Sequence, residues 1–440
     1  MSAKAVARGT SRKRLMFWFP NCLLSSRSRA HRPGSVGPST GRVLFREFVA
    51  LDPVAHACIR LKLVLLIRSF PHSSDNAGLH QLAVRNSDVL SRGGNGGRSS
   101  VSGVTAAVFG CSGFVGRYVA QALGSMGVRL VLPYRCDETD VQHLRTMGDL
   151  GMIVMQENFS VRDQEAVKRA VEGVDVVINV LGADHETWNY TFEDVHVKWA
   201  ETLATACEDA KVERLLHFSA LGASEGAPSR RLRTKHAGDE ILKGALGDRT
   251  TVFKPAPITG PEDRLFRKFA SQIKKMPFVP LVDGGKQKVQ PIWIRDVAQC
   301  AVNALSEYES MGKEYELTGP ETFTMKDLAK FSFETIRERP NTIDLPAAAA
   351  KLLAAPGDML AANSPVRIRF AGISVDSVDE TRIDLVQTQG TLSAADLGVK
   401  VHKVTEGLPI EFLRHYRSGG YDLGSVGAGE GKFTAPPHVG

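Results

Sequence analysis

The sequence is poor in cysteine, and the cysteines it has are not spaced for a metal site or a disulfide framework. Its six cysteines include no Cys-x-x-Cys pair, and no paired histidine cluster accompanies them. Structural zinc sites and disulfide scaffolds both depend on such spacings. The sequence therefore predicts no metal site and reduced, mostly buried thiols.

A long apolar run is also missing. The most apolar segment, Leu61–Ile67, is interrupted by Lys62 and flanked by Arg60 and Arg68. A helix needs about 20 apolar residues to cross a bilayer. This segment is too short to do so.

Acidic side chains are scarce only in the first part of the chain. Residues 1–98 contain 16 Lys and Arg but four Asp and Glu, whereas the remainder has 39 basic and 44 acidic residues. The body is therefore mildly acidic despite the net charge of +7. Since the body also lacks a basic aromatic stripe, we expect no nucleic-acid partner.

The acid-poor leader is rich in Arg and Ser, a composition typical of transit peptides. We predict a mitochondrial presequence, rather than a plastid one, and a flexible glycine linker within residues 1–97. A disordered basic arm is the alternative interpretation.

The chain does contain an apolar run that ends in closely spaced glycines. Val104–Phe109 predicts a strand, and Gly110, Gly113 and Gly116 lead from it into a helical pattern. In dinucleotide-binding folds, such glycines allow a sharp turn, backbone approach to the diphosphate and close packing of helix on sheet. We expect a phosphate-binding turn with Gly113 at positive φ. An ordinary glycine turn between two core elements is the alternative.

Apolar runs and helical patterns alternate beyond this turn, which is typical of a doubly wound parallel sheet. The fold class is therefore α/β of Rossmann type, with an NAD(P)-binding domain over 98–320. A smaller mixed, helical region with a disordered tail is expected over 321–440. The predicted strands are 128–134, 152–155, 174–180, 214–219 and 250–254, and the predicted helices include 137–150, 163–171, a capped helix after Thr191, 323–336 and an amphipathic stretch at 347–360 interrupted at Pro356.

Arg135 ends the second predicted strand, where a dinucleotide fold places the residue that reads the ribose. No Asp or Glu stands at that strand end, and a cation suits a 2′-phosphate. We therefore expect NADP(H) rather than NAD(H). A solvated Arg is the alternative, and Asp137 follows closely.

Several short motifs occur in a fixed order along the chain. They are 97–103, 110–118, 133–137, 147–151, 176–179, 192–195, 254–264 and 291–297. This ordered set resembles a family of accessory subunits of mitochondrial respiratory complex I, which are atypical, extended short-chain dehydrogenase/reductases. The resemblance covers residues 97 to about 305 and continues only in patches such as 407–417.

The resemblance implies a non-catalytic subunit that holds NADPH structurally and supports assembly. It implies a peripheral position on the matrix side of the inner membrane and contacts with other complex I subunits. Peripheral contact with membrane lipid is instead an expectation from the amphipathic stretch 347–360, for which a helix packed on its own domain is the alternative. Ser160 departs from the family pattern, which often has an Asp toward the adenine. The cofactor-binding residues carried over are Gly110, Ser112, Gly113, Phe114, Val115, Gly116, Arg135, Leu181, Gly182, Lys235, Pro255 and Ile258.

An acid/base tyrosine is missing where reductases of this superfamily have one. Lys235 is the candidate lysine, and Arg231 stands four residues before it. An arginine stays protonated and exchanges no proton near neutral pH. Ser219 keeps the auxiliary hydroxyl position, with a strand-end hydroxyl bonded to backbone as the alternative, and a solvated lysine is the alternative for Lys235. We therefore expect no catalytic residue.

Two other functions remain open at this point. One is a free NADPH-dependent reductase or epimerase of the same superfamily. The other, RNA binding by a related fold in plastids, is disfavoured by the missing basic aromatic stripe.

Overall fold

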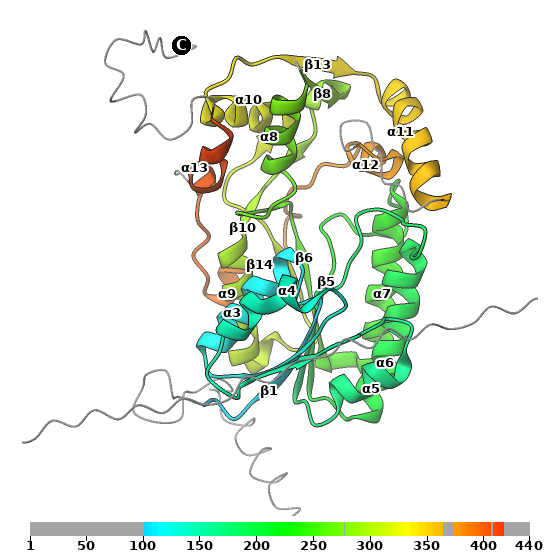
Figure 1. Cartoon of the computed structure of the whole chain (residues 1–440), viewed down its shortest axis with the longest axis vertical. Helices are drawn as coiled ribbons and strands as arrows, with labels where there is room; N and C mark the ends of the chain where they lie inside the picture. Colours follow the sequence, from blue (N-terminus) through cyan, green and yellow to red (C-terminus); the bar gives the residue numbers. More distant parts are fainter. Residues whose placement is uncertain (1–100, 277, 364–372, 406–407, 418–440) are drawn as a thin grey trace, which may run out of the picture. The chain divides into compact units, whose positions relative to one another are not determined.

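The computed structural model describes residues 101–276, 278–363, 373–405 and 408–417. The predicted presequence with its linker and the predicted disordered tail lie outside the described residues. An eight-stranded parallel sheet of order β3-β2-β1-β4-β5-β6-β11-β14 forms the centre (Figure 1). Its strands are β1 (Thr105–Phe109), β2 (Arg129–Pro133), β3 (Ile153–Gln156), β4 (Val176–Asn179), β5 (Arg214–Phe218), β6 (Thr250–Pro255), β11 (Glu314–Leu317) and β14 (Leu392–Ser393).

Helices cover both faces of this sheet, which confirms the doubly wound α/β fold (Figure 1). On one face, α3 (Phe114–Ser125) packs against α9 (Ile294–Ser306), and on the other α5 (Gln164–Val171), α6 (Trp199–Asp209) and α7 (Arg230–Leu246) pack side by side. Central strands such as β4 are buried along their whole length, as parallel strands covered on both faces must be.

The strand order reverses between β1 and β4, whose connections leave toward opposite faces. In open α/β sheets the crevice at the carboxyl ends of such strands is where ligands bind. The six strands predicted from apolar runs are all present, with ends shifted by one or two residues.

The predicted helix 137–150 is wrong as a single element. The segment forms α4 (Glu138–Val141), a 3-10 helix over Gln142–Thr146 and then a turn. Its buried side chains, Val141 and Leu144, belong to the main apolar core.

The cap predicted at Thr191 is confirmed, because the Asp194 amide donates to Thr191 Oγ1 at 3.2 Å and the Thr191 amide to Asp194 at 3.3 Å. Between this cap and α6 lies a π-helical turn, Asp194–Lys198, which the sequence did not predict.

The chain beyond β6 adds a second apolar cluster and several short ladders. Helices α8 (Phe266–Lys275), α10 (Met325–Ile336) and α13 (Leu408–Leu413) meet there. β14 lies beyond residue 320 yet pairs with β11, so the sheet takes one strand from the C-terminal region, and the domain limits stay a prediction. The short ladders are β7 (Ile258–Thr259) with β10 (Ile292–Trp293), β9 (Lys288–Val289) with β12 (Phe323–Thr324), and β8 (Val279–Val282) with β13 (Thr342–Leu345).

Helix α11 (Ala347–Asn363) is continuous, so the interruption predicted at Pro356 is wrong. Proline removes the hydrogen bond to the carbonyl four residues earlier, that of Leu352. Leu352 is 77% exposed, so water can satisfy that carbonyl. The next helix is α12 (Val375–Glu380). None of the helices in the described ranges combines the length and apolar character that a bilayer crossing requires.

Candidate cofactor site

A cleft of about 470 Å³ lies at the carboxyl ends of β1, β4, β5 and β6. It brings together nine of the twelve residues expected to bind the cofactor. These are Gly110, Gly113, Phe114, Val115, Gly116, Gly182, Lys235, Pro255 and Ile258. Ser112, Arg135 and Leu181 are not among the residues that line it.

The glycine turn is shaped as a phosphate-binding turn requires. Gly110 has φ +89°. A Cβ on Gly116 would lie 2.1 Å from the Gly110 carbonyl oxygen, so α3 packs on the turn only because this position is glycine. Gly113 is the N-cap of α3 with φ −76°, and the expected positive φ there is wrong.

The chemistry of the turn fits a diphosphate. The first N–H groups of a helix have no partner within the helix, and they attract anions. The first turn of α3 contains no acidic residue that would repel one. Burial raises the pKa of Cys111, within the turn, to about 12, so this thiol fills space rather than reacts.

Arg135 follows the carboxyl end of β2, where the ribose of the cofactor is expected. Its guanidinium stands 5.1 Å from the ring centre of Tyr190, and Arg162 approaches the same ring at 4.7 Å. Burial opposes ionisation of Tyr190, but hydrogen bonds involving Ser160 and Arg135 outweigh it and lower its pKa. Two cations therefore gather beside Ser160, and Arg162 is a residue that sequence reasoning missed.

Lys235 lies on α7, is partly buried and has a protein partner, so the solvated alternative is wrong. Its ammonium donates to the Ser219 carbonyl at 2.9 Å. Burial, and then the charge of Arg231, lower the pKa of Lys235 to about 8. Leu181 shares a small enclosed cavity of about 10 Å³ with Lys235, next to the cleft.

Arg231 occupies the place of the acid/base tyrosine, and its guanidinium is held by two carboxylates. Its Nε donates to Glu380 Oε1 at 2.6 Å and its Nη2 to Oε2 at 3.0 Å. Asp184 lies 3.8 Å from Nη1. A guanidinium held in this way neither gives nor takes a proton.

Ser219 is engaged as well, by a buried network rather than by backbone. Its hydroxyl donates to Asp239 Oδ2 at 2.6 Å, and His217 Nε2 lies 3.0 Å from Oδ1. Since the Asn179 amide faces His217 Nδ1 at 3.0 Å, the network assigns the His217 proton to Nε2. Burial opposes ionisation of Asp239, but the bonds from His217 and Ser219 lower its pKa. The single Ser219 proton is thus committed to Asp239.

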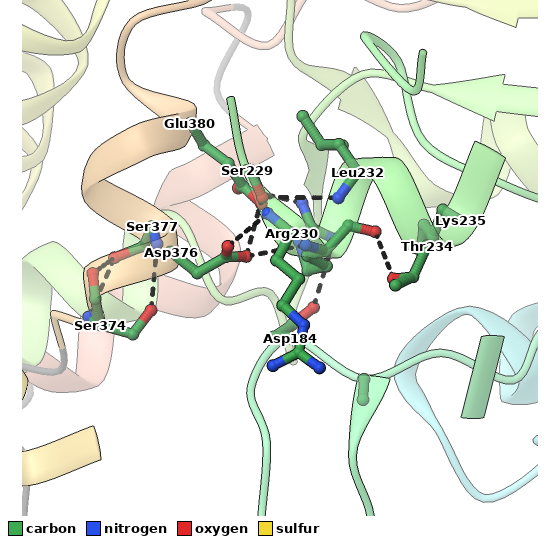
Figure 2. Close-up of polar contacts among 12 residues, drawn as sticks. Asp184, Ser229, Arg230, Leu232, Thr234, Lys235, Ser374, Asp376, Ser377 and Glu380 are labelled. Atoms are coloured by element: carbon green, nitrogen blue, oxygen red, sulfur yellow. Dashed lines mark hydrogen bonds and ion pairs between the residues drawn. The ribbon is translucent and has the colours of Figure 1, made fainter. Parts of the chain in front are cut away.

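Helix α12 closes one side of the cleft by capping α7 (Figure 2). Asp376 accepts from the Arg230 amide at 2.7 Å and from the hydroxyl of Ser229, the N-cap of α7, at 2.8 Å. Figure 2 shows Asp376 and Glu380 pointing together at this first helical turn. Two carboxylates therefore satisfy and neutralise the positive end of the helix that carries Lys235.

Sequence reasoning missed four charged residues of the cleft, namely Asp184, Arg264, Lys268 and Glu380. Asp184 had a signal, because it follows the carboxyl end of a central strand. Lys268 and Glu380 had none, since they come from α8 and α12, whose approach to the cleft is set by long-range packing.

Comparison with known proteins agrees with this fold. The profile of the NAD dependent epimerase/dehydratase family matches residues 106–318. Two solved structures share the fold: the NADPH-dependent quinone oxidoreductase QOR2 of Escherichia coli, complexed with NADPH, at a TM-score of 0.53 and 19% identity over 70% of this chain and 100% of that chain, and the triphenylmethane reductase of a Citrobacter species, complexed with NADP(H), at 0.53 and 17% over 70% and 99%.

Curated relatives are more similar. The protein named NADH dehydrogenase (ubiquinone) 1 alpha subcomplex subunit 9, mitochondrial, of Arabidopsis thaliana is 41% identical over 348 residues, which cover 78% of this chain and 86% of that protein. The protein of the same name from Mus musculus is 42% identical over 54% of this chain and 63% of its own length. The mitochondrial NADH-ubiquinone oxidoreductase 40 kDa subunit of Neurospora crassa is 32% identical over 74% and 83%.

Proposed function

Because this chain belongs to the family of the mitochondrial NADH dehydrogenase 1 alpha subcomplex subunit 9, we propose that it is an accessory subunit of respiratory complex I. It binds NADPH as a structural component and supports assembly and stability, with no turnover of its own. The observation that carries this proposal is a pair of contacts in the dinucleotide cleft that leave no group for acid/base chemistry. Arg231 is bound to Glu380, and the Ser219 proton is donated to Asp239.

The residues present fit the cofactor in one orientation. The diphosphate lies on the turn Gly110–Gly116, including Ser112, and the nicotinamide ribose on Lys235. Leu181 and Gly182 line the cofactor after β4, and Pro255 and Ile258 line the nicotinamide. Arg135, with Arg162 beside it, takes the 2′-phosphate, which favours NADPH over NADH. A bound nicotinamide supplies hydride chemistry, but this chain contributes only binding and orientation.

The subunit is mitochondrial and lies peripherally on the matrix side of the inner membrane, in contact with other complex I subunits. Helix α11 supports contact with membrane lipid, because Leu352 and Met359 are 77% and 72% exposed and Leu353 and Leu360 lie nearby. An exposed apolar helix face is a suitable surface for the headgroup region.

The alternative is a free NADPH-dependent reductase or epimerase. The observation that favours it is Lys235, which keeps a lowered pKa of about 8 beside the expected nicotinamide ribose. A reaction would then need a proton donor other than Arg231, and a bound substrate or water molecule would have to be that donor.

Native electrophoresis of a mild detergent extract of mitochondria tests the proposal. We expect the subunit to comigrate with complex I and the purified complex to retain NADPH in one-to-one ratio with it. A subunit that migrates alone, and that oxidises NADPH with a carbonyl substrate, would establish the free reductase instead. The N-terminal peptide of the migrating subunit tests the presequence, because a chain starting at Met1 contradicts cleavage.

A further inference from the structure

The cofactor cleft contains more positive than negative charge. Its charged lining residues are Arg231, Lys235, Arg264 and Lys268 against Asp184 and Glu380. The two carboxylates are already used, because Arg231 pairs with Glu380 and Arg264 with Asp184. Lys235 donates to the Ser219 carbonyl. Lys268 is the cation of the cleft for which these contacts provide no partner.

Lys268 comes from α8 and is partly buried. Burial lowers its pKa, and the only opposing influence is the charge of Glu380, whose two oxygens are held by Arg231. Within the described ranges, its ammonium takes part in no hydrogen bond or ion pair. An ammonium that is partly withdrawn from water and has no partner is destabilising, and a ligand anion bound beside it would remove that cost.

A pocket of about 210 Å³, lined by both apolar and polar side chains, adjoins the cleft at this lysine. Lys268, Phe269, Glu380 and Leu385 line both cavities. The Glu380 carboxylate is held by Arg231, so its charge is balanced there. The walls away from the cleft include Leu281, Val289 and Ile373. For comparison, an apolar cavity of about 150 Å³ holds a benzene molecule. The pocket therefore has room for an aliphatic chain of medium length.

We propose that this pocket binds an aliphatic monocarboxylic acid of medium chain length. The carboxylate pairs with Lys268 and the alkyl chain lies against Phe269, Leu281 and Val289. A single flexible ammonium suits one carboxylate, whereas phosphate groups are usually held by several donors, such as arginine forks or backbone N–H groups. This inference goes beyond the accessory-subunit function and depends only on the cavity and its lysine.

Octanoate titrated into the full chain in the presence of saturating NADPH tests the proposal by calorimetry. We expect octanoate to bind and 1-octanol, which has the same chain without the charge, to bind at least tenfold more weakly. Lys268→Met removes the charge but keeps an unbranched side chain and is expected to weaken octanoate about tenfold. Lys275→Met, an exposed position on the same helix, is the matched control and leaves the affinity unchanged.

A second variant separates binding from folding. Leu281→Trp fills the pocket and is expected to abolish octanoate binding while NADPH affinity stays at the wild-type value. Equal binding of octanoate and 1-octanol, or undiminished octanoate binding in Lys268→Met, would overturn the proposal. Release of NADPH by octanoate would also overturn it, because the acid would then occupy the dinucleotide cleft.

Discussion

Lys235 carries its charge in a partly buried position, and its pKa is lowered to about 8, first by burial and then by the charge of Arg231. In an unfolded chain a lysine titrates near pH 10.4. Between these values the unfolded chain binds more protons than the folded chain. The free energy of unfolding therefore rises with pH through this interval, whereas below about pH 8 both states are protonated and the folded state bears the cost of the charge.

Lys235→Met is expected to remove this pH dependence. Between about pH 8 and pH 10, the ligand-free wild type should gain on the order of 1–3 kcal/mol of unfolding free energy relative to the variant. Urea unfolding at the two pH values measures the difference, and the exposed Lys275→Met variant serves as control. Parallel changes in wild type and Lys235→Met would mean that the lysine is solvated after all.

We expect Arg135 to discriminate between NADPH and NADH, provided that the second cation, Arg162, does not replace it. Arg135→Asp puts an anion beside the 2′-phosphate and removes charge-assisted hydrogen bonds worth about 1.5–3 kcal/mol. NADPH affinity should fall about tenfold to a hundredfold and NADH affinity much less. Fluorescence titration with both nucleotides measures this. Arg129→Asp, at the exposed opposite end of β2, should change neither, and equal losses in Arg135→Asp would exclude Arg135 as the discriminator.

At the scale of elements, the sequence predicted what local pattern determines. β1, β4 and the glycine turn were found because buried parallel strands are continuous apolar runs and their turns need glycine. Glu380 was not found, because it lies 149 residues from Arg231 in sequence. The π-turn before α6 was missed for a similar reason. The Cβ of any residue at Gly238 would lie 2.5 Å from the carbonyl oxygen of His196 in that turn, so tertiary packing of α7 sets its shape.

The contact between α7 and α12 is a matched ion pair whose side chains are each only about a fifth exposed. Removing one partner of such a pair leaves the other without its bonds, so Glu380→Gln should lower the free energy of unfolding by about 1–3 kcal/mol. Arg231→Met combined with Glu380→Gln should cost less than the sum of the two single variants. Urea unfolding completes the double-mutant cycle.

Asp379→Asn is the control for this cycle. Asp379 lies on the same helix but pairs with Lys351 of α11. The substitution therefore weakens the contact of α12 with α11 and leaves the contact with α7 unchanged. Protease cleavage within residues 373–387 should increase for Glu380→Gln more than for Asp379→Asn. Additive losses for the Arg231 and Glu380 variants would show that the pair does not hold α12 in place.

At the scale of the whole molecule, the structural cofactor that we propose would act through mass action. A ligand that binds only the folded chain stabilises it by about 2.7 kcal/mol at a hundred times its dissociation constant. That is a substantial share of the 5–15 kcal/mol typical of a folded protein. Assembly into a large complex is then expected to depend on cofactor occupancy, because an empty subunit unfolds and is degraded more often.

Gly113→Val separates occupancy from folding because of the geometry at this position. Gly113 has an extended backbone, and a Cβ there would lie 3.1 Å from the Gly110 oxygen, so the fold has to adjust by only a few tenths of an ångström. The branched side chain nevertheless enters the space that the diphosphate needs. Gly116→Ala, whose Cβ would lie 2.1 Å from the same oxygen, is expected to break the fold itself.

In cells we therefore expect Gly113→Val to lower subunit abundance and complex I assembly, although the purified ligand-free variant unfolds at nearly the same urea concentration as the ligand-free wild type. The complexes that do assemble should transfer electrons at the normal rate, because the cofactor takes no part in that reaction. Quantitative native electrophoresis and NADH oxidation per assembled complex measure both effects. Normal assembly of a variant that no longer binds NADPH would show that the cofactor is not structural. The free reductase would then be the favoured function.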